Sequence, residues 1–165
     1  MKPVDYAKNY ITIDEGTKDG VQIGMGIIAD NGIVGIVKAV SNNYATVTSL
    51  LHQKFMCSVK VGKKRELTRL VWKSKSYKTC NLLSLPKHVN ISKGDSVFTS
   101  GYGGVFPEEI LVGIVKSVET KKEKSFHNVE VNLINDFNKL NNAYVVIDRM
   151  KEEKETIIET KKENE

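Results

Sequence analysis

The fold is decided by residues 21–40, VQIGMGIIADNGIVGIVKAV, in which two apolar runs flank an Asn-Gly pair. Asn31 and Gly32 both tolerate the positive φ of a tight turn, so they predict a hairpin between the two runs. The apolar residues are mostly Ile and Val, which are typical of strands, and they show no helical spacing. The stretch therefore predicts two short antiparallel strands.

Segments of the same kind recur along the whole chain, separated by Gly, Asn, Asp and Lys. Besides the two above, they are YITI, ATVTSL, FMCSVKV, LTRLVW, CNLLSL, SVFTS, ILVGIVKSV, NVEVNLI and AYVVI. Short strands at regular spacing, with no long helical pattern, indicate an all-β barrel or sandwich.

The stretch around the hairpin has a second copy later in the chain. Residues 113–118, GIVKSV, match residues 35–40, GIVKAV. The opening glycines of the two copies, Gly24 and Gly94, are 70 residues apart, whereas the matching strands are 78 apart, so the second copy carries eight additional residues. A unit of this size is only marginally stable when it folds alone. We therefore expect an all-β fold of two small tandem β-barrels packed together.

The repeat also suggests how the chain divides. We expect the first barrel over residues 9–75 and the second over residues 76–149, with the last strand able to close either barrel. Residues 150–165 are rich in Lys and Glu and contain few apolar residues. We expect this segment to be a charged, flexible tail.

The charge is unevenly distributed. The chain has 25 Lys plus Arg against 20 Asp plus Glu, a formal net charge of +5. Eight cations between residues 60 and 78 are accompanied only by Glu66, and we call them the basic stripe: Lys60, Lys63, Lys64, Arg65, Arg69, Lys73, Lys75 and Lys78. Such a stripe fits nucleic acid, lipid headgroups or an acidic wall polymer, or it is a solvated strand face. Charge alone does not choose among these.

The cysteines and histidines offer little chemistry. Cys57 and Cys80 lie in strand-like runs without CxxC spacing, which favours buried free thiols, and a disulfide requires that the fold bring them together. A zinc site from these cysteines with His52 and His88 would need four ligands from segments with no paired spacing. We therefore expect no metal site.

The triplet Gly94-Asp95-Ser96 invites comparison with the nucleophile region of two-barrel serine proteases. Val97 follows where an oxyanion hole of that kind requires glycines. We interpret the triplet as a turn in which Gly94 takes the bend, Asp95 bonds nearby backbone and Ser96 starts a strand. The sequence thus predicts no enzyme and no cofactor.

The additional residues of the second copy fall at or near residues 100–109, SGYGGVFPEE, which we call the insert. It carries four candidate partner-binding residues: Tyr102, Val105, Phe106 and Pro107. Such side chains on a Gly-rich turn cost stability if left in water. They either fold back over the barrel end or bind a partner, and the sequence leaves both open.

From about Asn9 to Asp148 the chain resembles the extracytoplasmic domain of the bacterial rod shape-determining MreC family. The resemblance rests on four anchors in the family's order: the IDEG-x-x-DG opening, the NGIVGIV hairpin, the VTSL strand and TSGYGGVFP. Where the family usually has Gly and then Pro after the FP pair, this chain has Glu109 and Leu111.

The resemblance implies a pair of β-barrels without catalysis. Such a protein would be a scaffold of the cell-elongation machinery that controls cell shape by binding and positioning peptidoglycan-synthesis enzymes. The implied partners are the class B penicillin-binding transpeptidase and other membrane proteins of the elongation complex, with self-association as a dimer or higher oligomer. The implied location is the extracytoplasmic (periplasmic) face of the inner membrane, with anchoring by an N-terminal helix absent from this chain.

An alternative reading is a basic SH3/KOW-like barrel module that binds RNA. The basic stripe would contact phosphates, with Trp72 and Tyr77 as the nearby stacking faces. No RNP-like run of aromatic residues supports this reading, so we expect no nucleic-acid partner.

Overall fold

The computed structural model describes residues 8–148, and every predicted segment coincides with a strand. The strands are β1 (Tyr10–Ile13), β2 (Gly26–Ala29), β3 (Gly32–Val40), β4 (Ala45–Ser49), β5 (Met56–Val61), β6 (Glu66–Val71), β7 (Thr79–Pro86), β8 (Ser96–Ser100), β9 (Glu108–Glu119), β10 (Phe126–Leu133) and β11 (Tyr144–Val145). One 3-10 turn, η1 (Thr17–Asp19), follows β1. Within residues 8–148, none of the helical structure has the length and hydropathy needed to span a bilayer.

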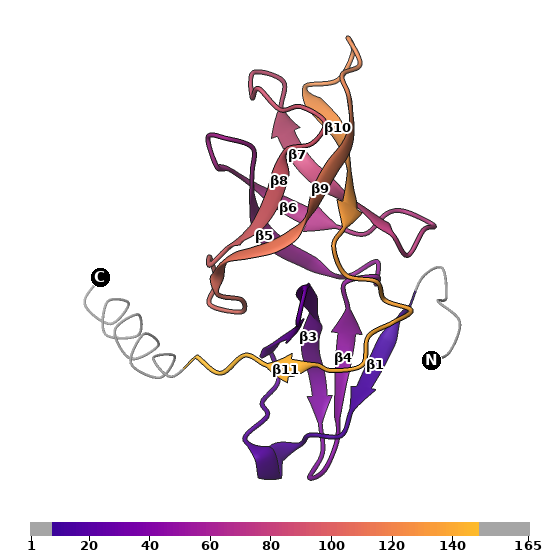
Figure 1. The fold of residues 1–165 in the computed structure, drawn as a ribbon, viewed down its shortest axis with the longest axis vertical. Helices are drawn as coiled ribbons and strands as arrows, with labels where there is room; N and C mark the ends of the chain where they lie inside the picture. The colour runs from indigo at the N-terminus through magenta and orange to yellow at the C-terminus, as the bar shows by residue number, and fades with distance from the viewer. Residues whose placement is uncertain (1–7, 149–165) are drawn as a thin grey trace, which may run out of the picture.

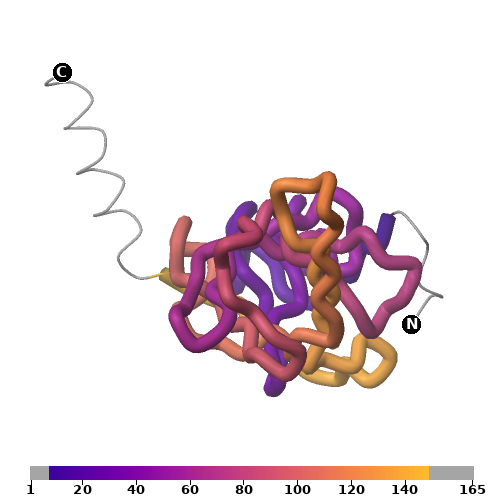
Figure 2. The backbone as a smooth tube through the Cα atoms, turned by 90° about the horizontal axis from the view of Figure 1, so that it is seen from above, coloured from indigo at the N-terminus to yellow at the C-terminus, as the bar shows by residue number. Residues whose placement is uncertain are grey.

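The strands form two antiparallel sheets, one above the other in Figure 1. Six strands close a barrel in the order β10-β7-β6-β5-β8-β9, and the other five form a sheet in the order β1-β4-β3-β2-β11. The segment between β10 and β11 runs down beside both units and brings β11 to β2, where Tyr144 pairs with Ile28 (Figures 1 and 2). The all-β class with two packed units is confirmed, and the last strand joins the first unit.

The sheets do not divide the chain at the expected boundary between residues 75 and 76. β5 and β6 belong to the closed barrel, where β5 pairs with β8 and β6 pairs with β7. The first sheet instead ends with β4 and regains only β11. The duplicated unit spans only three strands, β2–β4 in the first copy and β8–β10 in the second. The strands β5, β6 and β7 complete the second copy. Its six strands close into a barrel without free edges. The charged tail at residues 150–165 lies outside the described residues.

Backbone hydrogen bonds show that the duplication is structural. In the first sheet, Val37 exchanges bonds with Gly24 and the residue after it, both at 2.9 Å. In the barrel, Val115 does the same with Gly94 and the residue after it, at 2.9 and 2.8 Å. Gly24 and Gly94 share nearly the same φ, 89° and 94°. Gly24 and Gly94, which are 70 residues apart, therefore occupy equivalent positions in the two copies. The same holds for Val37 and Val115, which are 78 residues apart.

A glycine at a matching position in each copy permits close strand contact. A Cβ on Gly113 in β9 would collide with the backbone carbonyl of Asn132 and lie 2.8 Å from a methyl group of Val131. At Gly35 in β3 the equivalent clash is with the carbonyl of Thr48. Both strands are bulged near these positions, which increases twist and brings neighbouring backbones together.

The hairpin between β2 and β3 forms as predicted, but its turn lies one residue earlier. Ala29 pairs with Gly32, so the two-residue loop is Asp30–Asn31, and neither loop residue has positive φ. Gly32 is needed for a different reason. A Cβ there would lie 2.9 Å from Ile134 and 3.0 Å from the carbonyl of Leu111, so Gly32 lets the hairpin approach the barrel.

A single hydrophobic cluster runs through both units, with Ile27 and Val34 from the sheet and Val59 and Leu70 from the barrel all at most 1% exposed. The buried amide of Asn135 donates a hydrogen bond of 2.9 Å to the carbonyl of Ile33 and so links the two units. The two units thus pack on each other, as their small size predicts.

Candidate functional site

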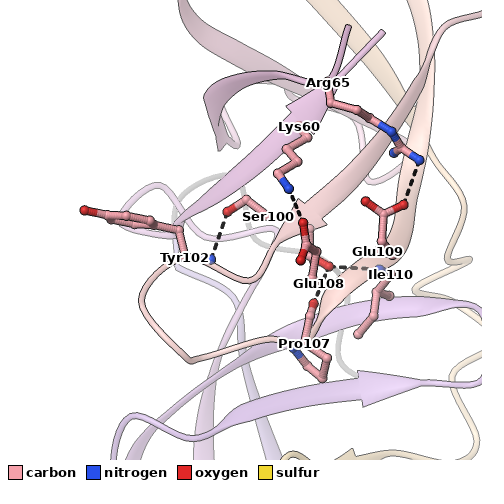
Figure 3. A network of polar contacts seen from close by, with 9 residues as sticks. Lys60, Arg65, Ser100, Tyr102, Pro107, Glu108, Glu109 and Ile110 are labelled. Carbon is pink, nitrogen blue, oxygen red and sulfur yellow. Dashed lines mark hydrogen bonds and ion pairs between the residues drawn. The ribbon is translucent and has the colours of Figure 1, made fainter. Parts of the chain in front are cut away.

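The insert is a loop with a defined backbone between β8 and β9. The Thr99 hydroxyl accepts the N–H of Ile110 at 2.9 Å and donates to the carbonyl of Pro107, which ties the two ends of the loop together (Figure 3). The Ser100 hydroxyl accepts the N–H of Tyr102 at 3.1 Å. The three glycines of the insert, Gly101, Gly103 and Gly104, all have positive φ, between 69° and 85°, which L-residues with side chains rarely adopt.

The four candidate partner-binding residues are in different environments. Phe106 is 6% exposed, and its ring lies against Gly26 of β2, where an added Cβ would be 2.9 Å from the ring. Tyr102 is 78% exposed and points away from the barrel (Figure 3). Val105 is half-buried and Pro107 is exposed. The fold-back alternative therefore holds for Phe106, whereas Tyr102 is the most exposed large apolar side chain of the insert.

A mainly apolar groove of about 110 Å³ lies between the insert and β5. Its walls come from both units: Ile36, Met56, Cys57, Ser58, Thr99, Gly101, Tyr102, Val105 and Phe106. Met56 is 49% exposed beside it. The sequence did not indicate Ile36 or Met56 as site residues, because they are ordinary strand residues that only the packing of the two units brings to the insert.

Two ion pairs hold the end of the insert to the barrel. Lys60 of β5 pairs with Glu108, and Arg65 pairs with Glu109 at 2.7 Å (Figure 3). The hydrogen bond from Lys60 lowers the pKa of the Glu108 carboxyl. Consecutive strand residues normally face opposite sides, but a bulge here places both carboxylates on the outer face.

Glu109 sits at φ 69°, in the left-handed region that disfavours a side chain. We expect Glu109→Gly to raise the free energy of unfolding by about 0.5–1 kcal/mol, because relief of this strain outweighs an exposed ion pair. Urea unfolding measures the change. Glu108→Gly, a matched control outside the left-handed region, is expected to lower stability, and a loss in both variants would contradict the interpretation.

The basic stripe is split by these ion pairs. Lys60 and Arg65 are neutralised by the insert. The other six side chains are exposed and form no ion pair with any residue in 8–148: Lys63, Lys64, Arg69, Lys73, Lys75 and Lys78. Trp72 is 1% exposed and Tyr77 is half-buried, so the stacking faces that the RNA alternative needs are largely covered.

The cysteines are free and buried inside the barrel, and burial raises the pKa of Cys57 to about 12. His88 is exposed. Within residues 8–148 there is no group of three or more His, Cys, Asp or Glu side chains arranged to hold a metal. The turn interpretation of the Gly94 triplet fits the structure, since the Asp95 carboxylate accepts the N–H of Ser92 at 2.8 Å.

His52 is a buried histidine that the sequence did not distinguish. It is 2% exposed, its Nδ1 accepts the N–H of Lys54 at 2.9 Å, and its ring centroid lies 4.8 Å from that of Tyr10. Its Nε2 has no hydrogen-bond partner among the described residues. Burial, with smaller contributions from nearby lysines such as Lys38, lowers its pKa.

A lowered pKa in the folded state makes stability depend on pH. The unfolded chain binds the His52 proton with a pKa near ~6.5, and the folded chain binds it only at lower pH. Stability should therefore fall as the pH drops below about 6.5, by at most ~1.4 kcal/mol per pH unit for one proton. His52→Asn, which keeps an acceptor near Nδ1, should remove this component in unfolding measured at neutral pH and near pH 5. The exposed control His88→Asn should leave it unchanged, and equal pH dependence in all three proteins would exclude His52 as the cause.

Three comparisons place the chain among known proteins. A protein-family model described as "Rod shape-determining protein MreC, barrel core" matches residues 2–147. The cell shape-determining protein MreC of Listeria monocytogenes is 35% identical over 115 residues, which is 68% of this chain and 39% of that protein. The chain thus spans well under half the length of this relative.

Solved structures share the fold. The crystal structure of MreC from Pseudomonas aeruginosa superimposes with a TM-score of 0.78 at 25% identity, covering 85% of this chain and 90% of that one. MreC in a complex with the penicillin-binding protein PBP2 from Helicobacter pylori gives a TM-score of 0.59 at 20% identity, covering 73% of this chain and 75% of that one. This second comparison shows a shared fold only. The duplicated strand unit, the insert and a family match over nearly all described residues together show that the chain belongs to the MreC family of rod shape-determining proteins.

Proposed function

We propose that this chain is a non-catalytic scaffold of the bacterial cell-elongation machinery, which binds and positions a peptidoglycan-synthesis enzyme at the extracytoplasmic face of the inner membrane. The proposed partner is a class B penicillin-binding transpeptidase, with self-association as a further property. A family member from Helicobacter pylori forms a complex with PBP2, which supports a partner of this class.

The observation that carries the proposal is the exposed Tyr102 beside the apolar groove. Tyr102 is 78% exposed on a loop whose backbone is fixed by hydrogen bonds, so binding would cost little ordering of the loop. Tyrosine is enriched among residues that dominate binding energy, and Met56 nearby adds an adaptable apolar contact. A partner side chain that fills the groove would contact both units at once.

Binding of this kind regulates without chemistry. A scaffold that prefers one conformation of a transpeptidase shifts its population by the difference in affinity between conformations. The groove contains residues of the first sheet and of the barrel, so an occupant would also fix how the partner is oriented relative to both.

Tyr102→Ala tests the proposal. We expect it to weaken binding to the purified transpeptidase by about tenfold or more, equivalent to ~1.4 kcal/mol, in surface plasmon resonance. Tyr44→Ala is the control, because Tyr44 is a comparably exposed tyrosine (53%) on the β3–β4 hairpin. Unchanged binding of the Tyr102 variant, or equal weakening in both variants, would remove the insert from the interface.

A further inference from the structure

The outer face of β5, β6 and β8 alternates apolar and cationic side chains. Lys60 of β5 is paired directly with Leu67 of β6 on one side and with Phe98 of β8 on the other. In the next row, Arg69 of β6 is paired with Leu83 of β7. Directly paired residues project from the same side of a sheet, so these side chains form one surface. We call it the β5–β6 face, including Lys63 and Lys64 on the connecting turn.

This surface has apolar groups that the chain leaves in contact with water. Leu67 is 57% exposed, and Leu83 and Phe98 are half-buried. The Arg65 guanidinium lies over the Phe98 ring, 4.2 Å from its centroid. Lone exposed leucines are common, but Leu67 lies opposite Lys60 and two residues before Arg69 on the same side of β6, and arginine is enriched at protein interfaces.

The chain itself shows which ligand these cations accept. Glu108 and Glu109 already bind Lys60 and Arg65 on the side of the face next to the insert. On the other side, Arg69, Lys63 and Lys64 are exposed and have no carboxylate partner among residues 8–148. Two cations of the face are thus already paired with carboxylates of the insert. The other three cations could pair with carboxylates in the same way.

We infer that the β5–β6 face binds an acidic protein segment in which carboxylates alternate with aliphatic side chains. Its carboxylates would pair with Arg69 and the turn lysines, and its aliphatic side chains would cover Leu67 and Leu83. An arginine can hold a carboxylate through two parallel hydrogen bonds, which gives this pairing directional specificity. The inference is independent of the proposed function, because none of the cations and apolar residues of this face lines the Tyr102 groove and its test uses no transpeptidase.

A protein segment fits this face better than the other anions that a basic stripe attracts. Nucleic acid would need stacking faces, but Trp72 is buried and the Phe98 ring is covered by Arg65. A lipid bilayer would need apolar side chains that reach several ångströms below the headgroups. Here the apolar groups other than Leu67 are half-buried on strands and cannot reach that depth.

The test uses a fluorescent octapeptide of alternating Glu and Leu, titrated with the chain and followed by anisotropy. We expect saturable binding that weakens about tenfold or more in the Lys64→Glu/Arg69→Glu variant and several-fold in Leu67→Ser. Lys121→Glu/Lys122→Glu is the matched control, because it changes charge equally at two exposed lysines between β9 and β10. It should alter affinity less than twofold. Thermal unfolding of each variant checks that the fold is kept.

Several results would overturn the inference. One is no saturable binding up to millimolar chain concentration. Another is equal weakening by both double variants, which would mean non-specific charge attraction. A third is an affinity that Leu67→Ser leaves unchanged, because the face would then recognise only the charge of the peptide. Tighter binding to an oligouridylate or to phosphatidylglycerol vesicles than to the peptide would assign the face to nucleic acid or to membrane.

Discussion

Gly113→Ala is expected to destabilise the protein by at least ~3 kcal/mol, because the added methyl group would collide with the backbone carbonyl of Asn132. A backbone atom in a closed barrel cannot rotate away as a side chain can, so the strands β9 and β10 must separate. Urea unfolding followed by circular dichroism should show a large fall in the midpoint concentration. Gly35→Ala should behave alike, since Gly35 meets the carbonyl of Thr48 in the same way.

Gly94→Ala is the matched control for this prediction. Gly94 has φ 94° and no atom within 4 Å of an added Cβ, so the substitution adds backbone strain without a collision. We expect a loss of about 1–2 kcal/mol. If Gly113→Ala proved no more harmful than Gly94→Ala, the close strand contact would not be what requires glycine in the duplicated unit.

Phe106→Ala is expected to lower the free energy of unfolding by about 3–5 kcal/mol, the usual cost of removing a buried aromatic ring. The ring is 6% exposed and packs between the insert and Gly26, so its loss leaves a cavity where the barrel meets the first sheet. Differential scanning calorimetry would record the change in unfolding temperature.

Tyr102→Ala is the control within the same loop. At 78% exposure this side chain contributes little to folding, so stability should change by no more than about 0.5 kcal/mol. A small effect of Phe106→Ala would mean that Phe106 is not a structural anchor. The contrast also shows why Phe106 variants are unsuitable for testing partner binding: they would alter the fold that presents the insert.

Much of the fold follows from sequence pattern alone. Eleven strands, the hairpin after β2 and the duplication could be predicted because each depends on local features: β-branched runs, turn residues and recurring Gly spacing. The repeated glycines, Gly24 and Gly94, make equivalent backbone hydrogen bonds with Val37 and Val115.

The grouping of strands into sheets could not be predicted in the same way. The assignment of β5 and β6 to the barrel depends on pairing with β8 and β7, which are distant in sequence, and nothing local distinguishes these strands from those of the first sheet. The site was predictable in part. The composition of the insert identified the right loop, but whether Phe106 or Tyr102 faces water depends on Gly26, a residue 80 positions before Phe106.

The return of β11 to the first sheet gives the molecule a mechanical asymmetry. β1 and β11 are the two outer strands of one sheet, so tension applied between Tyr10 and Val145 runs across that sheet and bypasses the barrel. The weakest element in this line is β11, which is held by two residue pairs. Under load, β11 should peel from β2 first, and until it does so the barrel with its insert carries no tension.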